Sequence, residues 1–356
     1  MDRINVNKPY LPDMDRYKKY LDRIWKNHHL TNFGPLSIEL EEKLCEYLGV
    51  DNLLLVSNGT LALQIAYKVL DIKGEVITTP FSFAATTNTL LWEGLKPIFC
   101  DIDSETFCID EQKIEPLITS ATEAILPVHV FGNPCEAESI DKISKKHNLK
   151  IIYDAAHAFG VKYKNKSVFN YGDISTLSFH ATKLFHCIEG GALIAKDKEL
   201  IAKAKKIINF GLSNSFPELL GINAKNSEFH AAMGLCILED MDIIFQERQK
   251  IWEYYYKELK DFFCVQKISK YANNNFHYFP ILLENEEKLL NVLKTLEAKN
   301  IFPRRYFYPA LNTLRFNLVH QDCPIAEDIS NRILCLPIYM GLSQKDQDKI
   351  IEGLKF

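Results

Sequence analysis

The sequence lacks the features that would place the protein in a membrane or outside the cell. No uninterrupted apolar run among its 356 residues approaches the roughly 18 residues that a membrane-spanning helix needs. The N-terminal segment contains no apolar stretch of the kind that directs secretion. The nine cysteines form no C-x-x-C pair and no cluster with histidine at zinc-binding spacing. We therefore expect a cytoplasmic protein with reduced thiols, no membrane segment and no metal site.

Several common catalytic signatures are missing as well. There is no G-x-G-x-x-G run after an early strand, which is evidence against a nicotinamide dehydrogenase, and there is no Walker A run, H-E-x-x-H or G-x-S-x-G motif. The formal net charge of −4 predicts no general attraction to nucleic acid or to an anionic membrane. The hydrophobic content of 47% and the charged content of 25% are typical of a soluble globular protein.

Apolar, strand-like runs alternate with helical patterns along most of the chain. The predicted strands cover residues 53–56, 75–79, 96–100, 124–128, 149–153, 174–178 and 192–195, and the predicted helices include 61–69, 86–93, 137–147, 227–239, 286–298 and 323–334. This alternation predicts the α/β class, with a mainly parallel mixed sheet that helices cover on both faces. A long helical pattern near residue 242 is expected to lead into a smaller α+β domain. The predicted domains are 1–243 and 244–356.

The strongest chemical signal surrounds one lysine. Lys183 follows the strand-like run that ends at Ser178 and precedes the pair Gly190-Gly191, and Asp154 ends another apolar run 29 positions earlier (183 − 154). A neutral lysine amine can bond covalently to an aldehyde, an aspartate can keep a ring nitrogen protonated, and hydroxyls can bind a phosphate. A pyridoxal phosphate (PLP) enzyme needs these three kinds of group. Taken alone, Lys183 is more typical of a solvated surface lysine.

Two further segments could contribute to such a site. The turn Ser57-Asn58-Gly59-Thr60 connects a strand to a helix, so its backbone N–H groups and hydroxyls could bind a phosphate. The alternative is an ordinary helix N-cap, which Ser, Asn and Thr all favour. Phe83 lies near the C-terminal end of a predicted strand, where ligands of α/β sheets bind and an aromatic ring can lie on a planar ligand. The alternative for Phe83 is a plain core aromatic.

Taken together, these motifs resemble the DegT-type nucleotide-sugar aminotransferases, PLP enzymes with the aspartate aminotransferase fold (fold type I). The resemblance runs nearly end to end. Its most specific parts are SNGTLAL at 57–63, DAAHAFG at 154–160, SFHATK at 178–183 with the following EGG, and GINAKNSE at 221–228. It implies a fold type I α/β architecture, PLP as cofactor, and a homodimer whose active sites lie at the subunit interface.

The resemblance also implies a role for each matched residue. Lys183 would hold PLP covalently, and Asp154 would face its pyridine nitrogen. His157 would lie beside the ring near O3′, and Phe83 would stack on the ring. The implied phosphate contacts are Asn58, Gly59, Thr60 and Ser178, with Asn223 reaching in from the neighbouring subunit. Many relatives have Ser or Gly where this chain has Asn58, so one phosphate contact could differ.

Family members take the amino group from glutamate and transfer it to carbon 3 or carbon 4 of a keto sugar on a nucleotide diphosphate. LTNFGP and GINAKNSEFHAAMG look most like the carbon-4 subgroup, which converts dTDP-4-keto-6-deoxyglucose to dTDP-4-amino-4,6-dideoxyglucose for surface polysaccharide such as O-antigen. The two negative charges of a diphosphate require local cations, for which Arg304, Arg305 and Lys225 are candidates beside the alternative of solvated surface charges. The residues expected to contact substrate are His180, Lys225, Arg305 and Tyr308.

Three rival functions differ from this one in ways that the sequence addresses. A 3-aminotransferase of the same family differs only in the carbon that is aminated. Relatives that dehydrate deoxysugars carry histidine in place of the lysine, so Lys183 is evidence against dehydration. A non-catalytic PLP-binding regulator is disfavoured by the acidic net charge and by the lack of a helix-turn-helix pattern.

Overall fold

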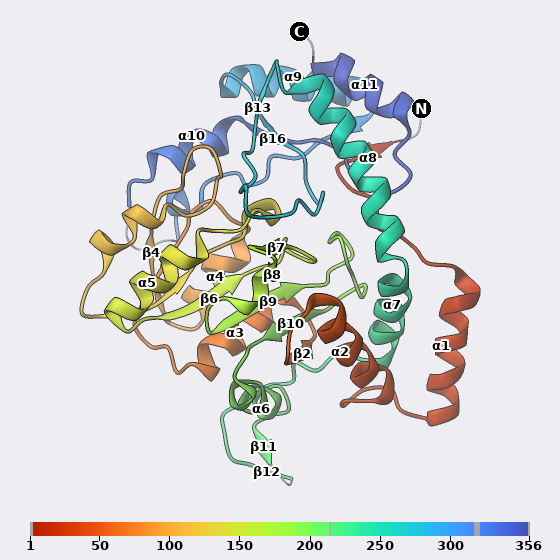
Figure 1. Cartoon of the computed structure of the whole chain (residues 1–356), viewed down its shortest axis with the longest axis vertical. Coiled ribbons are helices and arrows are strands. Elements are labelled where there is room, and N and C mark those ends of the chain that lie inside the picture. The colour runs from red at the N-terminus through yellow and green to blue at the C-terminus, as the bar shows by residue number, and fades with distance from the viewer. Residues whose placement is uncertain (1–2, 214, 317–320, 355–356) are drawn as a thin grey trace.

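A seven-stranded mixed sheet forms the centre of the computed structural model, which describes residues 3–213, 215–316 and 321–354 (Figure 1). Strand β10 runs antiparallel to both of its neighbours, whereas the other neighbouring strands of the sheet run parallel. The strand order is β2 (Leu53–Val56), β10 (Gly191–Ile194), β9 (Ile174–Ser178), β6 (Lys150–Asp154), β5 (Thr122–Leu126), β3 (Glu75–Thr78) and β4 (Lys96–Phe99). The predicted α/β class and mainly parallel sheet are confirmed.

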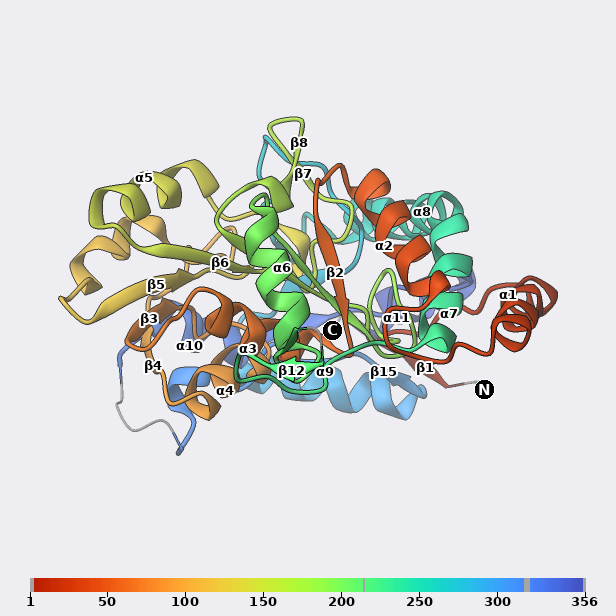
Figure 2. The same ribbon diagram turned by 90° about the horizontal axis from the view of Figure 1, so that it is seen from below.

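Helices cover both faces of this sheet, so most residues of its strands are buried. In β2, Leu53 and Leu55 belong to one hydrophobic core and Leu54 and Val56 to another, because successive side chains of a strand point to opposite faces. The first core contains residues of α2 (Pro35–Leu48), α5 (Ala137–His147) and α7 (Glu228–Glu239), and the second contains residues of α3 (Gly59–Val69), α4 (Ala84–Trp92) and α6 (Lys198–Ile207). Figure 2 shows α5 above the strands and α3 and α4 below them. Helix α1 (Met14–Asn27) packs against α7.

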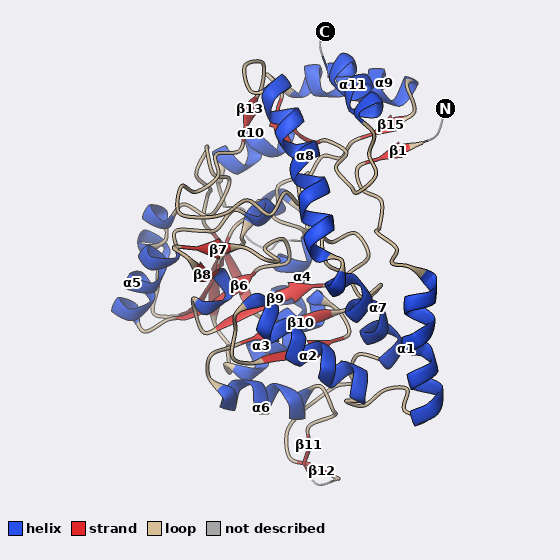
Figure 3. Cartoon of the chain, turned by 45° about the vertical axis from the view of Figure 1, so that its right-hand side comes forward, coloured by secondary structure: helices blue, strands red, loops and turns tan. Residues whose placement is uncertain are grey.

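The C-terminal third of the chain builds a third core around a small antiparallel sheet. The sheet has the order β13 (Cys264–Val265), β14 (Pro280–Leu282) and β16 (Ile333–Cys335), and it packs with α8 (Met241–Leu259), α9 (Glu286–Ala298) and α11 (Gln344–Leu354). Figure 3 shows α9 and α11 beside the upper end of α8. Strand β1 (Ile4–Asn5) pairs with β15 (Ile301–Phe302) in this region. The domain boundary predicted after residue 243 falls within α8 and stays a prediction.

The helix predicted for residues 323–334 is wrong at its C-terminal end. Helix α10 covers Pro324–Arg332 only, and β16 (Ile333–Cys335) follows it directly and pairs with β14. Helix α6 and four short strands were not predicted: β7 (Lys162–Tyr163), β8 (Lys166–Ser167), β11 (Leu212–Ser213) and β12 (Phe216–Pro217). Within the described residues, no helix has both the length and the apolar character needed to cross a bilayer.

Candidate active site

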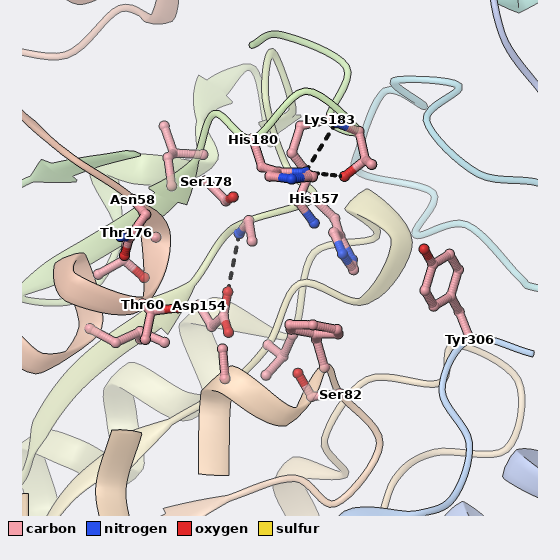
Figure 4. Close-up of a pocket in the computed structure, with 18 of the residues that line it drawn as sticks. Asn58, Thr60, Ser82, Asp154, His157, Thr176, Ser178, His180, Lys183 and Tyr306 are labelled. Atoms are coloured by element: carbon pink, nitrogen blue, oxygen red, sulfur yellow. Dashed lines mark hydrogen bonds between the residues drawn. The ribbon is translucent and has the colours of Figure 1, made fainter. Parts of the chain in front are cut away.

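A cavity of about 310 Å³ opens at the C-terminal ends of the parallel strands, which is where α/β sheets bind their ligands. It brings together nine of the predicted site residues, from segments far apart in the sequence. They are Asn58, Gly59, Thr60, Phe83, Asp154, His157, Ser178, His180 and Lys183. In Figure 4 the side chains of Lys183, His157 and Asp154 project into the same space. Phe83 is 58% exposed, so its ring borders the cavity and does not belong to the core.

Lys183 lies in the loop that follows β9. Its backbone N–H donates to the carbonyl of His180 at 2.8 Å, and the loop is closed by a hydrogen bond of 2.7 Å from the N–H of Ala181 to the carbonyl of Ile188. Burial lowers the pKa of the Lys183 ammonium to about 8, although the charge of Asp154 raises it. About one molecule in ten therefore carries a neutral, nucleophilic amine at pH 7.

Asp154 is the last residue of β6, and its carboxylate accepts two hydrogen bonds. The hydroxyl of Thr86 donates at 2.7 Å and the backbone N–H of Ala156 at 3.2 Å. Burial raises the pKa of Asp154 above its ordinary value, while these two donors and the charge of Lys183 lower it. A cationic group facing the carboxylate would therefore stabilise its ionised form.

His157 is a neutral imidazole whose tautomer follows from one hydrogen bond. The backbone N–H of Phe131 donates to its Nδ1 at 3.3 Å, so the ring proton lies on Nε2. Burial lowers the pKa of His157 well below its ordinary value, and the charges of Lys183 and His277 lower it further. The ring of Phe307 lies parallel to the imidazole with the centroids 5.6 Å apart. His157 is thus a fixed N–H donor at the wall of the cavity.

The turn that opens α3 is both a helix cap and a wall of the cavity. The Oδ1 atom of Asn58 accepts a hydrogen bond from the N–H of Leu61 at 2.8 Å, so Asn58 caps the helix while it also lines the cavity. A Cβ on Gly59 would lie 2.9 Å from the Cβ of Ser178, and a Cβ on Gly191 would lie 2.6 Å from the carbonyl carbon of Asn58. These two glycines let the ends of β2, β9 and β10 approach closely enough to place the helix N-terminus at the cavity.

Four predicted residues do not line the cavity. They are Asn223, Lys225, Arg305 and Tyr308. The guanidinium of Arg305 forms an ion pair of 2.7 Å with Glu286 and lies 3.3 Å from the ring centroid of Tyr308, so these two side chains pack on each other. Asn223 and Lys225 lie on the segment that follows the β11–β12 hairpin. The roles given to these four residues stay predictions.

Several cavity residues were not predicted. Thr176 lines the cavity beside Ser178, and the signal for it was available, because residues two apart in a strand share a face. Arg304 was only a candidate cation, yet it lines the cavity and donates to the hydroxyl of Tyr306 at 3.3 Å. The others are Ser82, Thr182, Glu189, Tyr278, Tyr306 and Phe307, with Leu63, Ala85, Val128, Ala156 and Leu177. The aromatic wall comes from the C-terminal part of the chain, which no local pattern connects to Lys183.

Known proteins match this chain over nearly its whole length. The sequence profile described as the DegT/DnrJ/EryC1/StrS aminotransferase family matches residues 13–355. A dTDP-4-amino-4,6-dideoxy-D-glucose transaminase of Shigella dysenteriae is 44% identical, with 99% of this chain and 98% of the relative covered. A GDP-perosamine synthase of Escherichia coli O157:H7 is 33% identical over the same shares. The crystal structure of DesI in the presence of its TDP-sugar product superposes with a TM-score of 0.94 at 31% identity, covering 99% of this chain and 93% of that one.

Proposed function

The chain belongs to the DegT/DnrJ/EryC1/StrS aminotransferase family and is a PLP-dependent nucleotide-sugar aminotransferase, and from that premise we propose its substrates. We infer that it moves an amino group from L-glutamate to carbon 4 of dTDP-4-keto-6-deoxyglucose, in the cytoplasm, for surface polysaccharide. The observation that carries the reaction is a lysine of lowered pKa in one cavity with a buried carboxylate. The name of the Shigella relative supports the choice of nucleotide and carbon.

The residues of the cavity fit PLP in their chemistry. When bound, PLP supplies a ring that accepts electrons as a bond to the amine-bearing carbon breaks. The lowered pKa of Lys183 favours the neutral amine, which can bond covalently to an aldehyde. The positive charge of a protonated ring nitrogen facing Asp154 would lower the pKa of this carboxyl, which burial raises. Phe83 offers an exposed ring for stacking, and Nε2–H of His157 can donate to O3′. The phosphate would be held by Asn58, Gly59, Thr60 and Ser178.

The chain's own residues would then move the proton and hold the ligand. Nζ of Lys183, once neutral, takes the proton from the amine-bearing carbon of glutamate, and it returns a proton to the sugar carbon that is aminated. The hydrogen bonds from Thr86 and Ala156 favour the charged form of Asp154 and oppose the effect of burial, which raises its pKa. Tyr306 borders the cavity, and its hydroxyl accepts a hydrogen bond from Arg304 at 3.3 Å.

The pH dependence of cofactor binding tests the role of Lys183. The rate at which PLP-free enzyme combines with PLP should rise about tenfold per pH unit below pH 8 and level off above it, because only the neutral amine reacts. Stopped-flow absorbance measures this rate. A free lysine derivative serves as reference, and its rate should keep rising toward its ordinary pKa of about 10.4. An enzyme rate that also rises up to that pH would contradict the pKa given for Lys183.

Adjacent arginines provide a matched test of diphosphate binding. Arg304→Gln should raise KM for the nucleotide sugar about tenfold with little change in kcat, since Arg304 lines the cavity and a charge-assisted hydrogen bond contributes about 1.5 kcal/mol. Arg305→Gln should leave KM near the wild-type value, because Arg305 pairs with Glu286. Steady-state kinetics separate the two constants. A raised KM in Arg305→Gln with an unchanged KM in Arg304→Gln would show that Arg305, and not Arg304, contacts the substrate.

The substrate itself is identified by a direct assay. The protein is incubated with PLP, glutamate and a panel of dTDP-, UDP- and GDP-linked keto sugars, and mass spectrometry and NMR identify the product and its aminated carbon. Amination of the dTDP sugar at carbon 4 is the expected result. Amination at carbon 3, or preference for another nucleotide, would contradict the proposed substrate. The absence of any amino transfer would contradict the assignment as an aminotransferase.

A homodimer is part of the same proposal. Large apolar side chains, among them Trp25, Phe216 and Leu220, are exposed in the single chain, as expected of a surface that a second copy covers. Asn223 lies outside the cavity of its own chain, in agreement with a role in the neighbouring subunit's site. Sedimentation at micromolar concentration should give the mass of two chains, and a monomer there would contradict the shared site.

A further inference from the structure

An extended N-terminal segment, residues 4–10, contacts two of the hydrophobic cores of the molecule. We call it the strap. Ile4 belongs to the C-terminal core and Val6 to a core of the large sheet. The strap therefore passes from one to the other within three residues, on the way to α1 (Figures 1 and 3). Pro9 restricts its own backbone and disfavours a helix at Lys8, which keeps the strap extended.

Backbone hydrogen bonds fix one end of the strap to the C-terminal part. Ile4 pairs with Ile301 and Asn5 with Phe302, and the N–H of Ile4 donates to the carbonyl of Asn300 at 3.0 Å. Two residues later, the carbonyl of Val6 accepts from the N–H of Ile338 at 3.1 Å. The strap cannot move independently of this part of the fold while these bonds are formed.

The other end of the strap is bonded to the loop that carries Lys183. Nδ2 of Asn7 donates to the carbonyl of Thr182 at 3.2 Å. Nδ1 of His186 accepts from the N–H of Ile188 at 3.3 Å, so its Nε2 carries the proton and donates to the carbonyl of Tyr10 at 2.8 Å. Asn7 thus reaches the residue directly before the lysine.

The hydrogen bond to Thr182 has a specific geometric effect. The carbonyl of Thr182, the N–H of Lys183 and the Cα of Lys183 lie in one rigid peptide plane. The N–H of this plane donates to His180 at 2.8 Å, and its oxygen accepts from Asn7. With both groups held, the plane cannot rotate, so the position of the Lys183 Cα and the direction of the N–Cα bond that leads to it are restrained.

We propose that Asn7 is a positioning residue for Lys183, and that the strap ties the position of this lysine to the C-terminal core. The importance of that position rests on the function proposed for Lys183. A proton-transferring group must be placed to within a fraction of an ångström, so a rotated peptide plane would slow the reaction and weaken the hold on PLP.

Hydrogen exchange in the PLP-bound enzyme tests directly whether the hydrogen bond from Asn7 to Thr182 restrains the loop that carries Lys183. Asn7→Ala should speed exchange of the backbone amides in residues 179–190 about fivefold, the factor that a lost hydrogen bond of about 1 kcal/mol corresponds to. Release of PLP into cofactor-free buffer should accelerate by a similar factor. Asn7→Asp keeps the shape of the side chain but replaces the N–H donor with a carboxylate oxygen that faces the Thr182 carbonyl, so it should speed exchange at least as much as Asn7→Ala.

The matched control is Asn5→Ala, because Asn5 lies in the same strap and its side chain accepts only from the exposed Arg3 at 2.9 Å among the described contacts. It should change neither rate. Unchanged exchange in residues 179–190 of Asn7→Ala, or an equal change in Asn5→Ala or in the strands of the large sheet, would overturn the proposal. The exchange measurement does not depend on turnover, so a failed proposal about Asn7 is distinct from a failed role for Lys183.

Discussion

Replacement of Lys183 by alanine should abolish both the visible absorbance of bound PLP and amino transfer from glutamate. The variant loses the amine that would bind the cofactor covalently and move the proton, and proton transfer by a positioned group contributes about 10²- to 10⁴-fold by itself. We expect activity to fall by at least about 10³-fold. Absorbance spectra and a coupled assay for 2-oxoglutarate measure the two effects on the same sample.

The control for this prediction is Lys142→Ala, since Lys142 is exposed on α5 and does not line the cavity. It should keep the spectrum and the activity of the wild type. Lys183→Ala should unfold at a temperature no lower than that of PLP-free wild type, because desolvation of an ammonium whose pKa is lowered disfavours folding at neutral pH. A Lys183→Ala enzyme that retains the absorbance band and turns over would refute the mechanism.

Replacement of Asp154 by asparagine should reduce kcat by about 10²- to 10³-fold while PLP still binds. Asparagine keeps the shape of the side chain but removes the negative charge that would hold the ring nitrogen protonated, and the loss of one preorganised charge costs about this factor. Bound PLP should show an altered absorbance spectrum. The oxygen of the introduced amide could still accept from Thr86, so the fold around β6 should persist.

Asp22→Asn is the control for charge removal, because Asp22 lies on α1, away from the cavity. It should have wild-type kcat. Thr86→Val provides an intermediate case, since it leaves the carboxylate in place but removes its donor at 2.7 Å. The pKa of Asp154 should then rise further, and the variant should lose activity at a higher pH than wild type as the pH is lowered. Near-normal turnover of Asp154→Asn would remove this residue from its role.

Much of the site could be predicted because its parts lie next to strand ends. Asp154 ends β6, Ser178 ends β9, and the turn before α3 follows β2 directly. In each case the apolar run and the polar residue at its end are adjacent in the sequence. Parallel strands then bring these ends to one edge of the sheet, so local patterns and the fold class suffice to place the residues together.

The choice between Arg304 and Arg305 could not be made in this way. Arg304 forms a β-bridge with Cys335, so the chain is extended there and neighbouring side chains point in opposite directions. One arginine faces the cavity and the other faces Glu286. Which of the two arginines faces the cavity depends on pairing with Cys335, 31 residues further along the chain (335 − 304). The sequence around the two arginines does not indicate this pairing.

The end of α10 was mispredicted for the same kind of reason. The run Ile333-Leu334-Cys335 is apolar and fits either the buried side of a helix or a buried strand. Pairing with β14, whose residues Pro280–Leu282 lie some fifty positions earlier, decides for the strand. Short apolar runs are resolved by tertiary contacts, which the local pattern does not contain.

The C-terminal core contains Ile4 as well as Leu354, so it joins segments that lie far apart in the sequence. The core on one face of the large sheet also contains Phe307, Leu311 and Ile329, so during synthesis both this core and the pairing of β1 with β15 must wait for the C-terminal part of the chain. Translation that stops short of Ile301 would leave β1 unpaired and would deprive the C-terminal core of Leu334, Ile350 and Leu354.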